Sequence, residues 1–145
     1  MSNIFDWQAF LEFAKKIYHD NEKIKVVDNT IEALGRIAIS RTYYAVYHSS
    51  RNFLLTINPT FEENIRGGSH EAVINAFLAE QDKLHRKIGR KLSLLKEQRV
   101  QADYISKCYP PRGHSGNIIS ALKMAIDSAD DINKIIAHCS QYVNS

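Results

Sequence analysis

The sequence contains few of the residues that cross-link a chain or bind a metal. Its 145 residues include two cysteines, Cys108 and Cys139, and neither has the paired spacing of a zinc ligand set or a redox CxxC motif. We therefore expect two reduced thiols and no disulfide framework. The six histidines form no HxxxH, HExxH or HxH pair, and no GxxxxGK(S/T) or GxGxxG loop occurs. These absences predict a protein without a metal or another cofactor.

Long apolar runs are missing as well. No stretch reaches the roughly eighteen consecutive apolar residues of a membrane-spanning helix, and the N-terminus lacks the basic start and continuous apolar segment of a secretory signal. The composition, 44% hydrophobic and 24% charged, is that of a chain able to bury one compact core. We therefore expect a single cytoplasmic domain over residues 1–145.

Glycine and proline are scarce, and most of them lie between stretches in which apolar residues recur at the three- and four-residue spacing of amphipathic helices. Thr30 is the expected N-cap of the second helix and Ser69 that of the short third helix. Trp7 and Phe10 are expected on the buried stripe of the first helix, and Leu78 on the inner side of the third. The expected helices span about 6–19, 30–55, 69–78, 82–105 and 117–142, with loops over 61–68 and 108–116. The sequence thus predicts an all-α fold, an up-and-down antiparallel bundle of four to five helices with the second helix at its centre.

Two polar residues stand on the apolar stripe of the predicted central helix. Arg41 and His48 are seven residues apart, about 10 Å along a helix axis, and project from the same face. Because burying an unpaired arginine is costly, Arg41 is expected to meet a carboxylate, a helix end, a partner subunit or a bound anion. Two interpretations stay open: a small phosphate site, or a structural pair beside a hydrogen-bonded core histidine. The acidic residues considered for such a pair are Glu71, Glu80, Asp103 and Asp127.

A second group of polar residues lies on the predicted fourth helix. Over residues 82–99, seven basic side chains face only Asp82 and Glu97, which gives this segment a net charge of +5 in a chain of net charge +3. Such a field would attract an acidic partner or a nucleic acid backbone, and a solvated helix face is the open alternative. Arg99 and Asp103 have the spacing of a structural ion pair within one helix. The basic residues are Lys83, Arg86, Lys87, Arg90, Lys91, Lys96 and Arg99.

One segment of the second helix carries a recognisable motif. Residues 40–48 read SRTYYAVYH and resemble the S-R-x-Y-Y-A-x-F/Y-H signature of small bacterial and archaeal HEPN proteins. Residues 69–72 followed by Phe77, and residues 99–104, are similar to later segments of that group. The resemblance extends over about residues 7–143.

This resemblance implies a helical bundle that is usually a homodimer, often encoded beside a minimal nucleotidyltransferase in toxin and antitoxin pairs or other antiviral defence loci. Many HEPN proteins are ribonucleases, in which an arginine and a histidine shortly after it are brought together across the dimer around one RNA phosphate. Arg41 and His48 match that motif and would be the catalytic pair. Histidine would act as acid or base and arginine as phosphate clamp, chemistry that needs no metal.

Two function hypotheses follow. The first is a metal-independent endoribonuclease of a toxin or defence system that acts as a homodimer. The second is a non-catalytic HEPN module that pairs with a nucleotidyltransferase antitoxin or binds RNA or a nucleotide, with Arg41 and His48 forming a structural polar cluster. The side chains expected to contact RNA or a partner are Tyr44, Arg51, Lys87, Arg90, Lys91 and Arg99.

Overall fold

A computed structural model of the chain describes residues 4–61, 69–105 and 116–143. Within these ranges the chain forms five helices and no strand, so the predicted all-α class is confirmed. The helices are α1 (Gln8–Asn21), α2 (Asn29–Ile57), α3 (Ser69–Leu78), α4 (Lys83–Tyr104) and α5 (Ile118–Val143). Each boundary lies within two residues of its expected place. Most residues of the two predicted loops, 62–68 and 108–115, lie outside the described ranges.

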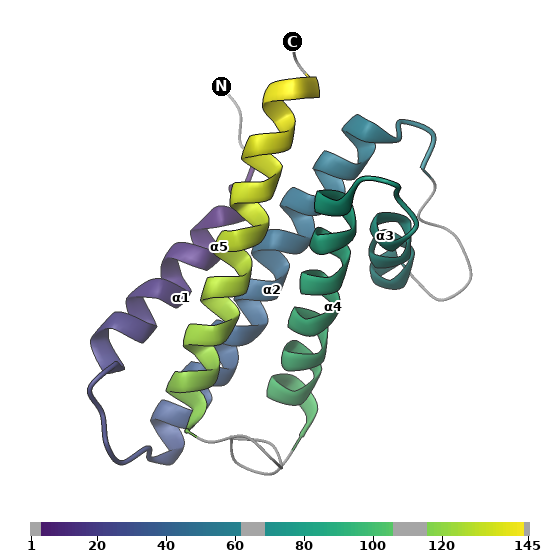
Figure 1. The fold of residues 1–145 in the computed structure, drawn as a ribbon. Helices are drawn as coiled ribbons and strands as arrows, with labels where there is room; N and C mark the ends of the chain where they lie inside the picture. Colours follow the sequence, from purple (N-terminus) through teal and green to yellow (C-terminus); the bar gives the residue numbers. More distant parts are fainter. Residues whose placement is uncertain (1–3, 62–68, 106–115, 144–145) are drawn as a thin grey trace.

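The four long helices lie side by side and alternate in direction, and the short α3 lies beside the upper half of α4 (Figure 1). α1 begins and α5 ends at the same end of the bundle. The central position predicted for the second helix is confirmed, because α2 packs against all four other helices. In the part of the chain that the structure describes, no helix combines the length and apolar content needed to cross a membrane.

Three of the four long helices, α2, α4 and α5, begin at polar side chains that accept backbone N–H groups. Asp28 Oδ1 accepts a hydrogen bond from the backbone N–H of Ile31 at 2.9 Å at the start of α2. Asp82 and Asn117 cap α4 and α5 in the same way. The prediction that Thr30 caps α2 was wrong, because Asp28 has the extended backbone of an N-cap and its carboxylate opposes the positive end of the helix dipole.

The core is one apolar cluster to which all five helices contribute, and its largest fully buried side chains come mostly from α2, α4 and α5. Two expected core residues are instead partly exposed. Trp7, with 36% of its surface exposed, lies at the N-cap of α1, and Leu78 lies at the last position of α3. Helix ends lie at the rim of a bundle, where a side chain is covered on one side only. In α1 and α3, the helical period therefore extended the buried stripe too far at one end of the helix.

Two glycines allow helices to approach closely. A β-carbon at Gly35 of α2 would overlap Cγ1 of the fully buried Ile118 of α5. At Gly89 of α4, a β-carbon would lie 3.0 Å from Cδ2 and 3.1 Å from the backbone nitrogen of Leu78. Gly89 therefore has a packing role, in addition to its cost of about 1 kcal/mol relative to alanine in a helix. These contacts set the spacing of α2 from α5 and of α3 from α4.

Replacing Gly35 by alanine should destabilise the protein. The added methyl group must displace Ile118, and overpacking of this kind costs about 1 to 3 kcal/mol. That cost exceeds the gain of up to about 1 kcal/mol from better helix propensity. Urea denaturation followed by circular dichroism measures the change.

A double-mutant cycle provides the control for this substitution. In an Ile118→Ala background the overlapping atoms are gone, so Gly35→Ala should become neutral or stabilising. If Gly35→Ala lowers the free energy of unfolding equally in both backgrounds, the close approach of α2 and α5 is not the cause.

Candidate site on the open face of α2

One side of α2 is only partly covered by the other helices. Its side chains follow one another at alternating spacings of four and three residues, which keeps them on the same side of the helix. Ile37 is 49% exposed, Arg41 is exposed, and the remaining members are half-buried. We call this strip the open α2 face. It consists of Ile37, Arg41, Tyr44, His48, Arg51 and Leu55.

Arg41 lies on this face and not in the core. The expectation of a buried arginine was wrong. Ala38 and Ala45 of the same stripe are buried, but the Arg41 side chain between them is exposed. Its guanidinium carbon lies 5.2 Å from the centre of the Phe10 ring, within range of a cation–π interaction. Arg41 forms no ion pair with the described residues. Three of the acidic residues considered for it pair elsewhere: Glu71 with Lys96, Asp103 with Arg99 and Asp127 with Lys123.

His48 lies two turns further along the same face. Its imidazole is stacked on the indole of Trp7, with ring centres 3.6 Å apart and planes inclined by 15°. The ring of Tyr47 meets it edge-on at 5.3 Å. The structure thus places Arg41 and His48 on one side of α2, as predicted, and adds an aromatic residue of α1 beside each of them.

The start of α1 is held in place by a chain of polar contacts. Gln8 Nε2 donates to the backbone carbonyl of Ala45 at 3.1 Å, and Gln8 Oε1 accepts from Asn133 Nδ2 at 2.9 Å. Ser49 Oγ donates to Asn133 Oδ1 at 3.3 Å. The chain joins α1, α2 and α5, and Gln8 directly follows Trp7. This explains why the indole lies at a defined position over His48.

A second polar cluster lies on the other side of the open α2 face, where α2 meets α3 and α4. Tyr43 Oη and His70 Nδ1 are hydrogen-bonded at 2.7 Å. The guanidinium carbon of Arg99 lies 5.6 Å from the Tyr43 ring centre and 5.7 Å from that of Tyr44. Arg99 also donates to Asp103 at 3.1 Å, so the predicted ion pair within α4 is confirmed. Of the predicted contact residues, the structure brings Tyr44 and Arg99 together.

Burial of Tyr43 perturbs its acidity. Burial among the neighbouring rings raises the pKa of the Tyr43 hydroxyl above its ordinary value of 10.0, Tyr47 adds to the increase and Arg99 opposes it. Tyr43 and Tyr47 are both buried. Their role is therefore to hold α3 against α2 through His70, whose ring stacks on Tyr47 at 4.2 Å.

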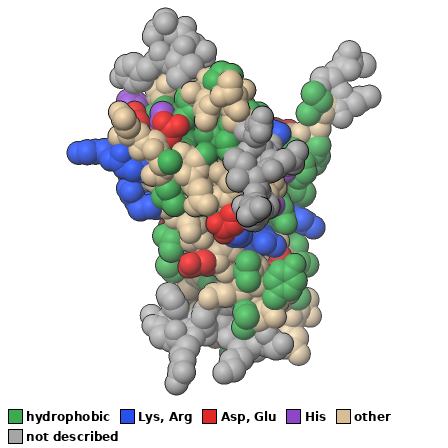
Figure 2. Space-filling view, turned by 90° about the vertical axis from the view of Figure 1, so that its right-hand side faces the viewer, with side chains coloured by type: hydrophobic (Ala, Val, Ile, Leu, Met, Phe, Trp, Pro, Cys, Tyr) green, Lys and Arg blue, Asp and Glu red, His purple; other side chains and the backbone are tan. Residues whose placement is uncertain are grey.

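The basic residues of α4 do not form one uniform patch. Seen from the side that carries α3, Lys and Arg side chains gather in separate groups with hydrophobic and acidic side chains between them (Figure 2). Arg86 donates to backbone carbonyls of the link between α3 and α4, and Lys91 pairs with Asp131 of α5 at 3.0 Å. Lys96 and Arg99 are paired as described above. Lys83, Lys87 and Arg90 remain exposed and have no ion pair with the described residues.

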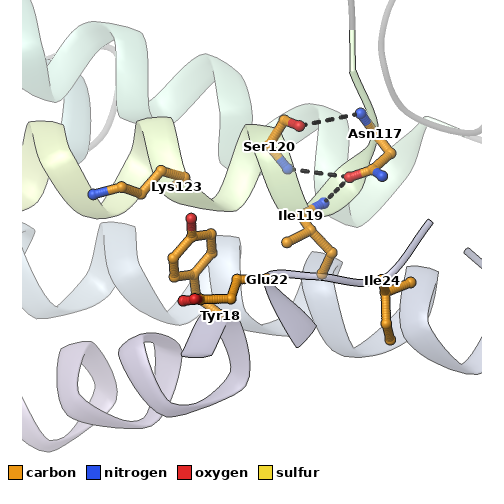
Figure 3. Close-up of a pocket in the computed structure, with 7 residues that line it drawn as sticks. All are labelled: Tyr18, Glu22, Ile24, Asn117, Ile119, Ser120 and Lys123. Atoms are coloured by element: carbon orange, nitrogen blue, oxygen red, sulfur yellow. Dashed lines mark hydrogen bonds between the residues drawn. The ribbon is translucent and has the colours of Figure 1, made fainter. Parts of the chain in front are cut away.

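A shallow hollow of about 350 Å³ lies at the far end of the bundle, where α1 ends and α5 begins (Figure 3). None of the predicted site residues lines it. Lys123 at its edge pairs with Asp127, and the Asn117 side chain accepts hydrogen bonds from the first turn of α5. Over the described ranges, no group of three histidine, cysteine or acidic residues is placed to hold a metal ion.

Reasoning from the sequence missed three residues next to the candidate site. Trp7 and Phe10 were assigned to the core stripe of α1, and His70 was not considered as a site residue. The only sequence signal was the excess of aromatic residues at the start of α1, which does not show which ring meets which residue of α2. That information depends on how α1 and α2 are aligned in space.

Replacing Tyr43 by phenylalanine tests the second cluster. Loss of the hydrogen bond to His70 should lower the free energy of unfolding by about 1 to 2 kcal/mol at neutral pH. The raised pKa of Tyr43 means that the folded protein keeps a proton that the unfolded chain loses above pH 10, so stability falls as the pH rises further. With Tyr43→Phe, the free energy of unfolding should fall less steeply above pH 10. Urea denaturation at neutral pH and above pH 10 measures both effects.

The control is Tyr18→Phe, which removes a hydroxyl from a half-buried tyrosine of α1 outside this cluster. It should change stability by no more than about 0.5 kcal/mol. Equal effects of the two substitutions at both pH values would show that the Tyr43 hydroxyl has no special role.

The chain was compared with family models, curated proteins and solved structures, and none of them matches. The candidate site is accordingly described by the geometry of Arg41, His48 and their neighbours. Its central elements are an exposed guanidinium on Phe10 and an imidazole on Trp7.

Proposed function

We propose that the protein is a metal-independent endoribonuclease of HEPN type that acts as a homodimer, with Arg41 and His48 at its active site. The observation that supports this proposal most directly is the position of Arg41. Its guanidinium is exposed on the open α2 face, forms no ion pair with the described residues, and shares that face with His48 two turns away. The resemblance of residues 40–48 to the HEPN signature points to the same two residues.

The chemistry of these side chains suits cleavage of RNA by transesterification. In this reaction the ribose 2'-oxygen attacks the adjacent phosphorus, the bond to the 5'-oxygen breaks, and a 2',3'-cyclic phosphate forms. An imidazole can act as a general base or a general acid, so His48 can take the proton from the 2'-hydroxyl or give one to the leaving 5'-oxygen. Arg41 stays charged and presents a planar set of donors to the phosphate oxygens. With one pair from each subunit, the two histidines would supply the two proton transfers and the two arginines would bind the phosphate.

The open α2 face also supports the proposed dimer. Its residues alternate at four- and three-residue spacings, the pattern with which one helix packs along another. Ile37 and Leu55 at its ends are apolar, and the polar residues lie between them. A second copy packed on this face would exclude water around the two Arg41 and His48 pairs, which strengthens electrostatic stabilisation of a phosphate. In this proposal, the exposed Lys87 and Arg90 of α4 attract the RNA backbone. The dimer would pair with a nucleotidyltransferase antitoxin.

Ribonuclease activity should depend on both residues. In buffer containing EDTA, purified protein should cleave single-stranded RNA, and His48→Ala or Arg41→Ala should each lower the rate at least about 100-fold. Arg41→Lys should retain only part of the activity, because lysine keeps the charge and loses the planar fork of donors. A gel assay of labelled RNA measures the rates, with circular dichroism confirming that each variant is folded.

His19→Ala is the matched control, because His19 is an exposed histidine of α1 far along the helix from Trp7. It should cleave at the wild-type rate. Equal rates for all variants would trace the activity to a contaminant and refute the assignment. RNA binding without cleavage by the wild type would favour a non-catalytic binding module.

The dimer is tested at Ile37. Light scattering at micromolar concentration should give twice the chain mass for the wild type and the single mass for Ile37→Lys, because an ammonium group next to the Arg41 cation would have to be desolvated at the interface. Met124→Lys is the matched control: Met124 is 54% exposed, similar to Ile37, and lies on α5 away from the open α2 face. A monomeric wild type would contradict an active site formed by two subunits.

A further inference from the structure

The start of the chain carries a group of aromatic rings that is open to solvent. Phe5 is 50% exposed and Trp7 is 36% exposed. The ring centres of Phe5 and Trp7 are 5.2 Å apart, with the rings edge-on to each other. The centre of Phe10 lies 5.1 Å from that of Phe5 and 5.7 Å from that of Trp7. We call Phe5, Trp7 and Phe10 the N-terminal aromatic cluster.

This cluster contacts both residues of the candidate active site. Phe10 lies under the Arg41 guanidinium, and Trp7 lies against the His48 imidazole. Both contacts occupy the inner side of the cluster, and Phe5 forms its exposed side. A molecule held by Arg41 would therefore have exposed aromatic surface directly beside it.

Aromatic surface next to a cation is the chemistry that binds single-stranded nucleic acid. The cation attracts a phosphate, and an aromatic ring stacks with a base whatever its identity, because every base has a flat π-face. The bases of a duplex are already stacked on one another and are not available for such a contact. An exposed phenylalanine has no favourable contact with water, whereas stacking on a base would cover it.

We propose that the N-terminal aromatic cluster is a stacking site for an unpaired base of single-stranded RNA, next to the phosphate that Arg41 binds. The identity of the ligand as RNA rests on the proposed function. The new element is the binding site itself: an aromatic surface that holds one unpaired base beside the bound phosphate. Phe5 contributes the exposed ring, and Trp7 and Phe10 hold it beside His48 and Arg41.

The test measures binding without cleavage. Trp7 is the only tryptophan of the chain, so its fluorescence reports directly on this cluster. The ligand is a short 2'-O-methyl RNA, which lacks the free 2'-hydroxyl needed for transesterification. Single-stranded oligonucleotide should change the Trp7 fluorescence on binding, and the same sequence as a duplex should bind about tenfold or more weakly.

The decisive variant is Phe5→Leu, which removes the exposed ring and leaves Trp7 in place. It should weaken binding of the single strand about tenfold, in line with the usual contribution of base stacking. Phe13→Leu is the matched control, because Phe13 is also an aromatic of α1, is 37% exposed, and has no ring contact with the cluster. It should bind like the wild type.

Three results would overturn the proposal: no binding of the single strand, equal binding of single strand and duplex, or unchanged affinity of Phe5→Leu. The remaining alternative is that a second copy of the chain covers this surface. Light scattering of Phe5→Leu tests it, because the variant would then have the mass of a monomer. Binding is read without cleavage, so the outcome stands apart from the ribonuclease assay. A protein that binds single strands through Phe5 and cleaves nothing would retain the stacking site and lose the proposed catalysis.

Discussion

The rest of the structure depends on the apolar packing of α1, α4 and α5 around α2, which leaves one side of α2 open to solvent. Buried α2 residues such as Ala38, Ile39 and Ala45 lie among α1, α4 and α5, and Gly35 lets α5 approach closely. A helix fixed in this way cannot rotate to hide polar residues without exposing the core. Arg41 and His48 are therefore presented on the surface by the packing of residues on the opposite side of the same helix.

The arrangement around the site depends on polar contacts as much as on the core. Gln8 links α1 to the backbone of α2 and, through Asn133, to α5. These hydrogen bonds fix the position of α1 along the axis of α2. On the other side, the hydrogen bond between Tyr43 and His70 and the pairing of Lys96 with Glu71 fix α3. The open α2 face is thus bordered by two elements whose positions are set by specific hydrogen bonds.

The helices could be predicted because their periodicity is a property of consecutive residues. The exposure of Arg41 could not, since α2 is apolar around most of its circumference and one stripe of such a helix runs from buried Ala38 to exposed Arg41. Contacts between helices were also beyond reach: Trp7 meets His48, and Tyr43 meets His70, only because of the alignment of separate helices. The pairing of Arg99 with Asp103 was predictable because both lie on one helix.

Several cations of this basic chain already have partners within the fold. Arg36 donates to the last carbonyls of α4, Arg86 to carbonyls of the link between α3 and α4, and Lys91 to Asp131. The number of basic side chains therefore exceeds the number that can replace the counterions of a nucleic acid. The logarithm of a binding constant for a single strand falls by about 0.7 per neutralised phosphate for each logarithmic unit of salt, so each cation held within the fold makes the dependence on ionic strength shallower. A stacking contact releases no counterions, and the share of affinity that it supplied would persist when salt is raised.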